Sequence, residues 1–329
     1  MFVHLNTHSV YSPMRGLLSL PDLMNLSRSH GMDTLALTDV NGMWGFIRFV
    51  QHCKDARIHP ITGTNLITEN DDVILLAENQ YGYENMCRAV SAVHDDPNQS
   101  MADILERRLV GLFVLAHKES TLKKLIKIIP DTHLFMELRP GVQESLMHQL
   151  AKKLKLEMVV TGDVYFRSQS DHDAHVTLRA IENNTTLEQL NISECKTDQH
   201  WFRNEAEMVK LFPNSLDALN NSRYLADRCK KDWSFINTIF PGLSLKETHI
   251  SNKKLKDKVY TGAKIRYGEV DETIRQRIEY ELDLITQKGF APYFLIVQDI
   301  VTQTRATIGR GSAAASIVSY CLFITQVDP

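Results

Sequence analysis

Short apolar runs alternate with amphipathic stretches over the first 165 residues of the chain. Several runs are continuously apolar, as in strands that are buried on both faces. Seven are strand candidates: Phe2–Leu5, Thr34–Thr38, Ile58–Gly63, Val73–Ala77, Gly111–Ala116, Leu134–Leu138 and Met158–Thr161. Between them, helical spacing of apolar residues occurs at Leu20–His30, Gly45–Asp55, Tyr83–Val93 and Gln143–Leu154. This alternation predicts an α/β fold, and seven strands favour a barrel covered by helices over residues 1–232.

A different pattern follows this region. The polar stretch Phe240–Lys258 predicts a connector, which we place at residues 233–270. After it, a strongly amphipathic helix is predicted at Glu272–Gln287 and ends at Gly289. An apolar run, Tyr293–Ile300, and a segment rich in glycine and alanine complete a second domain at 271–329. Because the last residues directly follow an apolar stretch, we expect this domain to be truncated.

Composition and charge describe an ordinary soluble protein. The chain is 43% hydrophobic and 23% charged, with a formal net charge of -3, so no overall basic field would bind nucleic acid. This argues against a protein that coats DNA, but it leaves room for a local phosphate site. The five cysteines are widely spaced without a C-x-x-C pair, which is typical of thiols in a reducing compartment. With no signal peptide and no run of roughly 18 apolar residues, we expect a cytoplasmic protein without membrane contact.

Histidine and aspartate side chains follow several of the predicted strands. His8, Asp39, His117 and Asp163 each come just after one of them. Barrel folds of this kind place their chemistry at the carboxyl ends of the strands, and imidazole and carboxylate groups are ligands for metals that activate water. The alternative is that these residues cap loops and bind backbone amides, since no tight H-x-H pair is present.

A glycine-rich turn near the end of the chain is the second candidate site. Gly309 and Gly311 would let the backbone approach an anion closely, and Arg310 and Ser312 add a guanidinium and a hydroxyl donor. A helix that begins there would point free N–H groups at a phosphate. The alternative is a helix start whose small residues only allow close packing.

Longer strings strengthen both interpretations. The segments FVHLNTHSVYSPMRGLLSLPDL, LALTDVNGMWGFIRF and HPITGTNL resemble, in order and spacing, the polymerase and histidinol phosphatase (PHP) domain of bacterial C-family DNA polymerases, the group of the DNA polymerase III alpha subunits. The string KGFAPYFLIVQDIV, followed by GRGSAAASIVSYCLFITQVDP, resembles the start of the palm of these polymerases. The resemblance implies a PHP-type irregular (β/α)7 barrel followed by a partial α+β polymerase palm. Arg-Gly at residues 15–16 is similar to the error-prone branch of this family.

The resemblance also implies that the metal site of the barrel is eroded. Positions that carry metal ligands in relatives with an intact site are here occupied by poor ligands or by a cation: Asn6, Arg15, Val40, Asn65 and Tyr165. His8, Asp39, His117 and Asp163 remain, and Asp39 is also a candidate for a purely structural role. Such a set would hold at most one metal, weakly, and would not build a cluster of two or three.

In the palm, the resemblance implies that Gly311 and Ser312 contact the triphosphate of the incoming nucleotide, with Gly309 and Arg310 beside them. The carboxylates that hold Mg²⁺ in these polymerases, an Asp-x-Asp pair and a third Asp, come later in the palm, and residues 271–329 contain no Asp-x-Asp pair. The segment before Gly309 is several residues shorter than in the family. We therefore expect the chain by itself to be catalytically inactive.

Three hypotheses follow. The first is a portion of a DNA-directed DNA polymerase, whose partners would be the rest of the polymerase chain, primer–template DNA, deoxynucleotides, Mg²⁺, and replication or translesion accessory proteins. The second is a stand-alone metal-dependent phosphoesterase or 3′–5′ exonuclease, which the replaced ligands disfavour. The third is a non-catalytic scaffold in which the barrel only supports the palm or another subunit.

Overall fold

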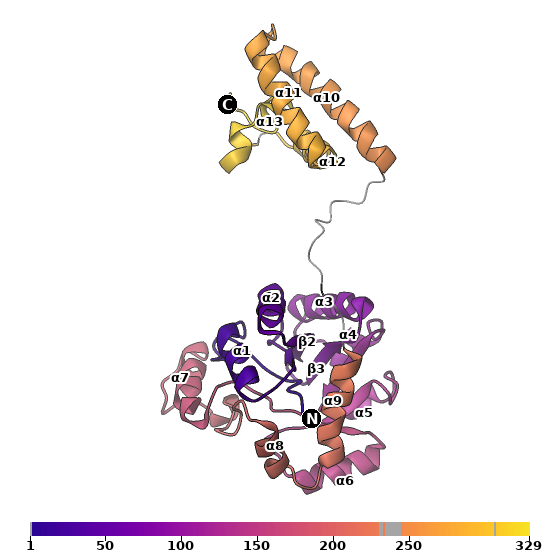
Figure 1. Cartoon of the computed structure of the whole chain (residues 1–329), viewed down its shortest axis with the longest axis vertical. Helices are drawn as coiled ribbons and strands as arrows, with labels where there is room; N and C mark the ends of the chain where they lie inside the picture. The colour runs from indigo at the N-terminus through magenta and orange to yellow at the C-terminus, as the bar shows by residue number, and fades with distance from the viewer. Residues whose placement is uncertain (1, 230–232, 234–244, 306) are drawn as a thin grey trace. The chain divides into compact units, whose positions relative to one another are not determined.

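The computed structural model of the chain describes residues 2–229, 233, 245–305 and 307–329. The chain folds into two compact units, Met1–Trp233 and Ser234–Pro329 (Figure 1). No helix in the described ranges is both long and apolar enough to cross a membrane.

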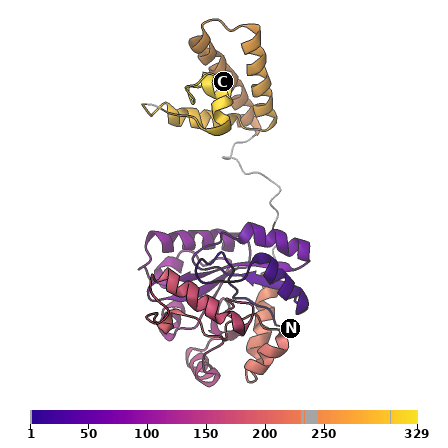
Figure 2. The same cartoon turned by 90° about the vertical axis from the view of Figure 1, so that its left-hand side faces the viewer.

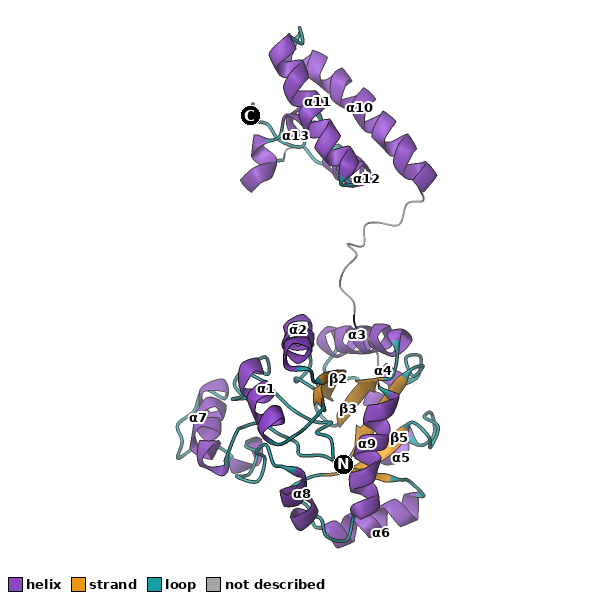
Figure 3. Ribbon diagram, in the orientation of Figure 1, coloured by secondary structure: helices purple, strands orange, loops and turns teal. Residues whose placement is uncertain are grey.

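Within the described residues, the first unit is built on a six-stranded sheet with the order β1-β2-β3-β4-β5-β6. Its strands are β1 (Thr34–Leu37), β2 (His59–Ile67), β3 (Asp72–Ala77), β4 (Leu112–Ala116), β5 (Leu134–Leu138) and β6 (Met158–Val160). Three neighbouring pairs, β1–β2, β4–β5 and β5–β6, are parallel, whereas β3 runs antiparallel to both β2 and β4. Figure 3 shows the strands in the middle of the unit with helices around them. The expected irregular α/β barrel is confirmed in this mixed form.

The predicted first strand, Phe2–Leu5, is wrong as a regular strand. The N–H groups of Phe2 and Val3 donate to the side chains of Glu205 (2.9 Å) and Ser222 (3.0 Å) instead of to a neighbouring strand. Because these donors are used by side chains, a repeated backbone ladder cannot form here.

The same N-terminal segment nevertheless links the two edges of the sheet. On one side, the Thr38 N–H donates to the Thr7 carbonyl (2.8 Å), just after β1. On the other side, the His8 N–H donates to the carbonyl of Val164 (2.8 Å), just after β6. Two further backbone hydrogen bonds, from Ala36 N–H to the His4 carbonyl (3.0 Å) and from Val164 N–H to the Asn6 carbonyl (3.1 Å), support the same links. The segment therefore closes the barrel through two backbone hydrogen bonds on each side, and it brings residues 6–8 next to the carboxyl ends of β1 and β6.

Helices surround this sheet. They are α1 (Leu20–Ser29), α2 (Phe46–Ala56), α3 (Gln80–Asp95), α4 (Met101–Leu105), α5 (Glu119–Leu125), α6 (Glu144–Leu154), α7 (His172–Glu182), α8 (Glu205–Leu211) and α9 (Leu216–Arg228). The four predicted helices correspond to α1, α2, α3 and α6. Helix α1 begins at a capping box formed by Ser19 and Asp22, with a proline in its first turn.

Both faces of the sheet are buried, which explains the continuous apolar runs. In β3, Val73 and Leu75 pack into one apolar cluster, whereas Ile74 and Leu76 pack into another. The second cluster also contains Leu225 from α9. This alternation follows the two-residue period of a strand, with apolar side chains at every position from Val73 to Ala77 because neither face meets solvent there.

The second unit is helical in its described residues (Figure 2). It contains α10 (Leu245–Tyr267), α11 (Glu272–Gln287), α12 (Ala291–Val301), the 3-10 helix η3 (Gly311–Ala315) and α13 (Ile317–Cys321). The predicted helix Glu272–Gln287 is confirmed with the same bounds, because Asp271 caps its start and Gly289 follows its end with φ +71°.

Two expectations for this unit differ from the structure. Residues 245–267 of the expected connector form α10, which packs through Leu255, Val259 and Ala263 into the core of this unit. Residues 234–244 of that connector lie outside the described residues. The strand component of an α+β palm has no counterpart in residues 245–305 and 307–329.

Candidate functional site

The side chains predicted at the strand ends gather at one end of the barrel. Residues 6–8 follow the closing N-terminal segment, His117 follows β4, and Asp163 follows β6. The Asn6 side chain connects them, because its Nδ2 donates to Asp163 Oδ1 (3.3 Å) and to Glu137 Oε1 (2.8 Å). His8 and Asp163 thus lie at the same end of the barrel, as expected for residues that follow the carboxyl ends of its strands.

Asp163 is fully committed to protein cations. Its Oδ2 lies 2.7 Å from Lys196 Nζ, 3.1 Å from His200 Nδ1 and 3.5 Å from Arg139 Nη1. Burial by itself raises the pKa of this carboxyl, but Lys196, Arg139 and His200 together hold the pKa of Asp163 well below its ordinary value. The carboxylate is therefore ionised and already neutralised by ammonium and guanidinium groups.

Arg139 holds the neighbouring groups in a similar way. Its Nη1 lies 3.5 Å from Asp72 Oδ2, and its Nη2 donates to His117 Nε2 at 2.9 Å. A guanidinium can only donate, so His117 Nε2 accepts, and the ring hydrogen lies on Nδ1, which is 3.6 Å from Glu137 Oε2. His117 thus has no lone pair left for a metal ion.

These contacts also fix the charge of the two acids. Although burial raises their pKa values, the pKa of Asp72 is lowered by Lys196 and Arg139, and that of Glu137 by His117 and Arg139. The result is a buried cluster in which Asp72 and Asp163 pair with Arg139 and Lys196, whereas Glu137 accepts hydrogen bonds from Asn6 Nδ2 (2.8 Å) and Thr161 Oγ1 (2.6 Å).

His8 is enclosed by protein groups. Its ring stacks on Tyr165 with the centroids 3.9 Å apart, its Nδ1 lies 3.1 Å from the Val164 carbonyl, and its Nε2 lies 3.3 Å from Asn65 Oδ1. Burial lowers the pKa of the His8 imidazole to about 4, so the ring is neutral at pH 7. Whichever nitrogen carries the hydrogen, the other faces a protein oxygen instead of an open ligand position.

Asp39 has a structural role in these contacts. Its carboxylate accepts hydrogen bonds from the Ser9 N–H (2.8 Å), from the Ser9 hydroxyl (2.9 Å) and from the Ser12 hydroxyl (2.7 Å). Burial raises its pKa. Asp39 therefore fixes the turn at Ser9–Ser12. This contact agrees with a structural role for Asp39 instead of a role as a metal ligand.

A cavity of about 340 Å³ opens above the cluster. Its charged lining comprises the cations Arg15, Arg139, Arg179 and Lys196 and the acids Asp72 and Glu194. Within the described ranges, no group of three or more His, Cys, Asp or Glu side chains is arranged to hold a metal ion. The residues present do not fit the multinuclear centre of an intact PHP site, because the carboxylates are already paired with internal cations.

The glycine-rich turn is built differently from the expected helix start. Gly311 has a φ of +61°, which favours glycine, and η3 begins at this residue. A break at Ser316 separates η3 from α13. Arg310 and Ser312 are exposed, and Ser312 also lines a cavity of about 300 Å³ next to Tyr293 and Phe294.

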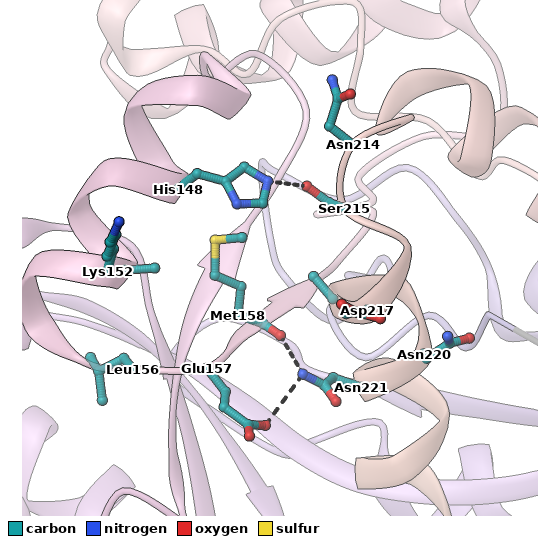
Figure 4. A pocket seen from close by; sticks show the side chains of 12 residues that line it. His148, Lys152, Leu156, Glu157, Met158, Asn214, Ser215, Asp217, Asn220 and Asn221 are labelled. Atoms are coloured by element: carbon teal, nitrogen blue, oxygen red, sulfur yellow. Dashed lines mark hydrogen bonds between the residues drawn. The ribbon is translucent and has the colours of Figure 1, made fainter.

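A larger polar cavity of about 620 Å³ lies between α6 and α9 (Figure 4). His148 Nε2 lies 2.8 Å from Ser215 Oγ there, and Ser215 Oγ donates to Glu144 Oε1 at 2.5 Å. Since the serine hydrogen points to the glutamate, the histidine donates to Ser215 and cannot act as its base. These contacts join α6 to the start of α9.

Sequence reasoning missed five members of the buried cluster. Asp72 begins β3, one residue before the predicted strand Val73–Ala77, so it does not follow a strand end. Arg139 directly follows a predicted strand, which is the pattern that identified His117, and Glu137 is a charged residue inside that otherwise apolar strand. The sequence therefore carried a signal for both residues. Lys196 and His200 come from an irregular segment after α7, where no periodic pattern indicates the side of the barrel that they reach.

Comparison with known families agrees with the two units. Residues 4–133 match the PHP domain, and residues 253–329 match the family described as the bacterial DNA polymerase III alpha NTPase domain. A solved two-domain protein from Bacteroides vulgatus, containing a predicted PHP-like metal-dependent phosphoesterase, is 13% identical, covers 56% of each chain and has a TM-score of 0.36. That similarity is too low to carry an argument.

Similarity to curated proteins covers nearly the whole chain. The error-prone DNA polymerase of Symbiobacterium thermophilum is 31% identical over 99% of this chain and 34% of its own length. The DNA polymerase III alpha subunits of Pasteurella multocida and Escherichia coli K12 are 31% and 28% identical over 100% of this chain and 32% of their own length. The chain thus spans about a third of the length of these relatives. It combines a PHP domain, in its first unit, with a segment of the bacterial DNA polymerase III alpha family in its second, and it is similar to these polymerases over essentially its whole length.

Proposed function

We propose that this chain is a portion of a DNA-directed DNA polymerase in which the barrel is a metal-free scaffold and the second unit provides part of the nucleotide site. The observation that supports the polymerase role is the similarity to polymerases over essentially the entire chain. The partners would be the rest of the polymerase chain, primer–template DNA, deoxynucleotides and accessory proteins, in a cytoplasmic setting.

The paired carboxylates support the scaffold role of the barrel. A phosphoesterase of this kind needs metals that polarise the phosphate and generate hydroxide. Here Asp72 and Asp163 are paired with Arg139 and Lys196, Glu137 is held by hydrogen bonds from Asn6 and Thr161, and His8 is closed off by Tyr165. The stand-alone phosphoesterase or exonuclease is therefore the weaker hypothesis.

In the second unit, Gly309, Arg310, Gly311 and Ser312 are proposed to contact the triphosphate. Arg310 and Ser312 are exposed, and the φ of Gly311 suits a turn that approaches an anion closely. Arg310 can bind phosphate oxygens with two parallel hydrogen bonds, and the Ser312 hydroxyl can add a third. In the whole polymerase, Mg²⁺ would align the 3′ hydroxyl and neutralise the phosphates.

A chimera tests the polymerase role. In it, this chain replaces the matching third of the Symbiobacterium error-prone polymerase. We expect template-directed primer extension, and we expect Arg310→Ala with Ser312→Ala to raise the KM for deoxynucleotide about tenfold, as the loss of charge-assisted hydrogen bonds implies. Lys254→Ala, which removes an exposed cation from α10, is the matched control. A folded chimera that does not extend a primer, or that is indifferent to both substitutions, contradicts the proposal.

A further inference from the structure

The carboxylate of Glu281 lies across the break between η3 and α13. It accepts hydrogen bonds from the Ser316 hydroxyl (2.7 Å), the Ile317 N–H (3.3 Å) and the Val318 N–H (3.2 Å). The first N–H groups of a helix have no partner inside the helix and favour a negative charge. The Glu281 carboxylate therefore supplies the negative charge that the first N–H groups of α13 favour.

Arg277 binds the other side of the same break. One turn earlier on α11, its Nε donates to Glu281 Oε1 (2.9 Å), and its Nη2 donates to the carbonyl of Ala315 (3.1 Å), the last residue of η3. Together the two side chains hold the end of η3 and the start of α13. Helix α11 is itself anchored, because Ile278, Leu282 and Ile285 are buried in the core of the unit.

This arrangement determines which donors remain for a ligand. The amides of Ile317 and Val318 are occupied by Glu281, whereas the amides of Gly311 and Ser312 come before the first hydrogen-bonded turn of η3 and have no hydrogen-bond partner within the described residues of this unit. The first two donors of η3 are therefore left for a ligand, and their direction depends on how the far end of η3 is held.

We propose that Glu281 and Arg277 are positioning residues that hold the glycine-rich turn and aim the free amides of η3 outward. They need not touch the nucleotide. Their effect on triphosphate binding rests on the proposed contact of the nucleotide with Gly309–Ser312. Their effect on the structure of the turn is independent of that contact. Both effects can be measured separately on the full 329-residue chain.

The informative variant is the charge swap Arg277→Glu with Glu281→Arg. It retains an ion pair at positions i and i+4 on α11, so a role limited to stabilising that helix is preserved. It also places a cation at the amides of Ile317 and Val318, which repels them. Glu272→Gln, at the exposed start of the same helix and without contacts to the turn, is the matched control.

Amide hydrogen exchange and nucleotide titration, both followed by NMR, give the two readouts. We expect exchange at Ile317 and Val318 to become roughly tenfold faster in the swap and to stay unchanged in Glu272→Gln. Titration with a deoxynucleoside triphosphate should shift the amides of Gly311–Ala313, with an affinity about five- to tenfold weaker in the swap.

The outcomes separate the two ideas. Unchanged exchange in the swap overturns the proposed hold on the turn. Faster exchange with unchanged triphosphate affinity overturns its positioning role. If the unmodified chain shows no shift at Gly311–Ala313, the proposed nucleotide contact is wrong, and the exchange result alone decides whether Glu281 and Arg277 hold the turn.

Discussion

Two cations, Arg139 and Lys196, are the residues on which the proposed metal-free barrel depends most. They neutralise Asp72 and Asp163 from within the protein, so the carboxylates stay ionised without a metal ion. Removing one cation leaves a buried charge without its partner, which is costly. Their contribution is therefore measurable as stability.

Lys196→Met should lower the free energy of unfolding of the first unit by about 3 kcal/mol, because Asp163 would be left partly unpaired. Urea unfolding followed by tryptophan fluorescence isolates this unit, since Trp44, Trp201 and Trp233 are the only tryptophans in the chain. Lys127→Met, on the exposed surface, is the control. A loss below about 0.5 kcal/mol would contradict a neutralising role for Lys196.

Three buried histidines make the first unit sensitive to acid. Burial lowers the pKa of His4, His8 and His175 to about 4, whereas the unfolded chain binds these protons near pH 6.5. Between these two values the unfolded state binds more protons, so stability falls as the pH falls from about 6.5 to about 4. The lowered pKa values of Asp163, Glu137 and Asp72 act in the same direction at lower pH.

The measurement is the tryptophan-monitored free energy of unfolding at several pH values between about 7 and about 4.5. His8→Gln should flatten this dependence, because the variant has one fewer group that gains a proton on unfolding. A free energy that stays constant over this range would show that the buried rings do not control acid stability.

At the scale of secondary-structure elements, the strands of the sheet and the main helices followed from local patterns. The helix at Glu272–Gln287 was predictable because its cap, its apolar spacing and Gly289 agree. The segment Phe2–Leu5 was not, because its N–H groups bind side chains from α8 and α9, which are more than 200 residues away in sequence. The pairing of Lys196 with Asp163 was equally beyond local patterns.

Helix α3 offers a test of how closely the elements pack. A Cβ at Gly82 would lie 1.8 Å from the carbonyl oxygen of Gly111, and neither backbone has room to move freely. Gly82→Ala should therefore destabilise the first unit by at least about 2 kcal/mol. The comparison is Ser91→Ala, on the exposed face of the same helix, in the same urea experiment. A neutral Gly82→Ala variant would mean that α3 does not sit against Gly111.

At the scale of the whole molecule, the two units have separate cores, and we expect them to unfold separately. A Cβ at Gly262 of α10 would lie 1.8 Å from the Cys321 carbonyl oxygen of α13. Gly262→Ala should lower the thermal stability of the helical unit, as seen in far-ultraviolet circular dichroism, without moving the tryptophan transition of the first unit. Equal shifts in both signals would mean that the units unfold together.

The central claim is that the PHP-type barrel is a scaffold whose carboxylates are neutralised by protein cations instead of metals. The most direct test is the metal content of the chain, measured by mass spectrometry on protein purified without added metal and again after incubation with Mn²⁺ or Zn²⁺. The pairing of Asp72 and Asp163 with Arg139 and Lys196, together with the hydrogen bonds that Glu137 accepts from Asn6 and Thr161, predicts fewer than one tightly bound transition metal per chain. Two or more tightly bound metals per chain would contradict it.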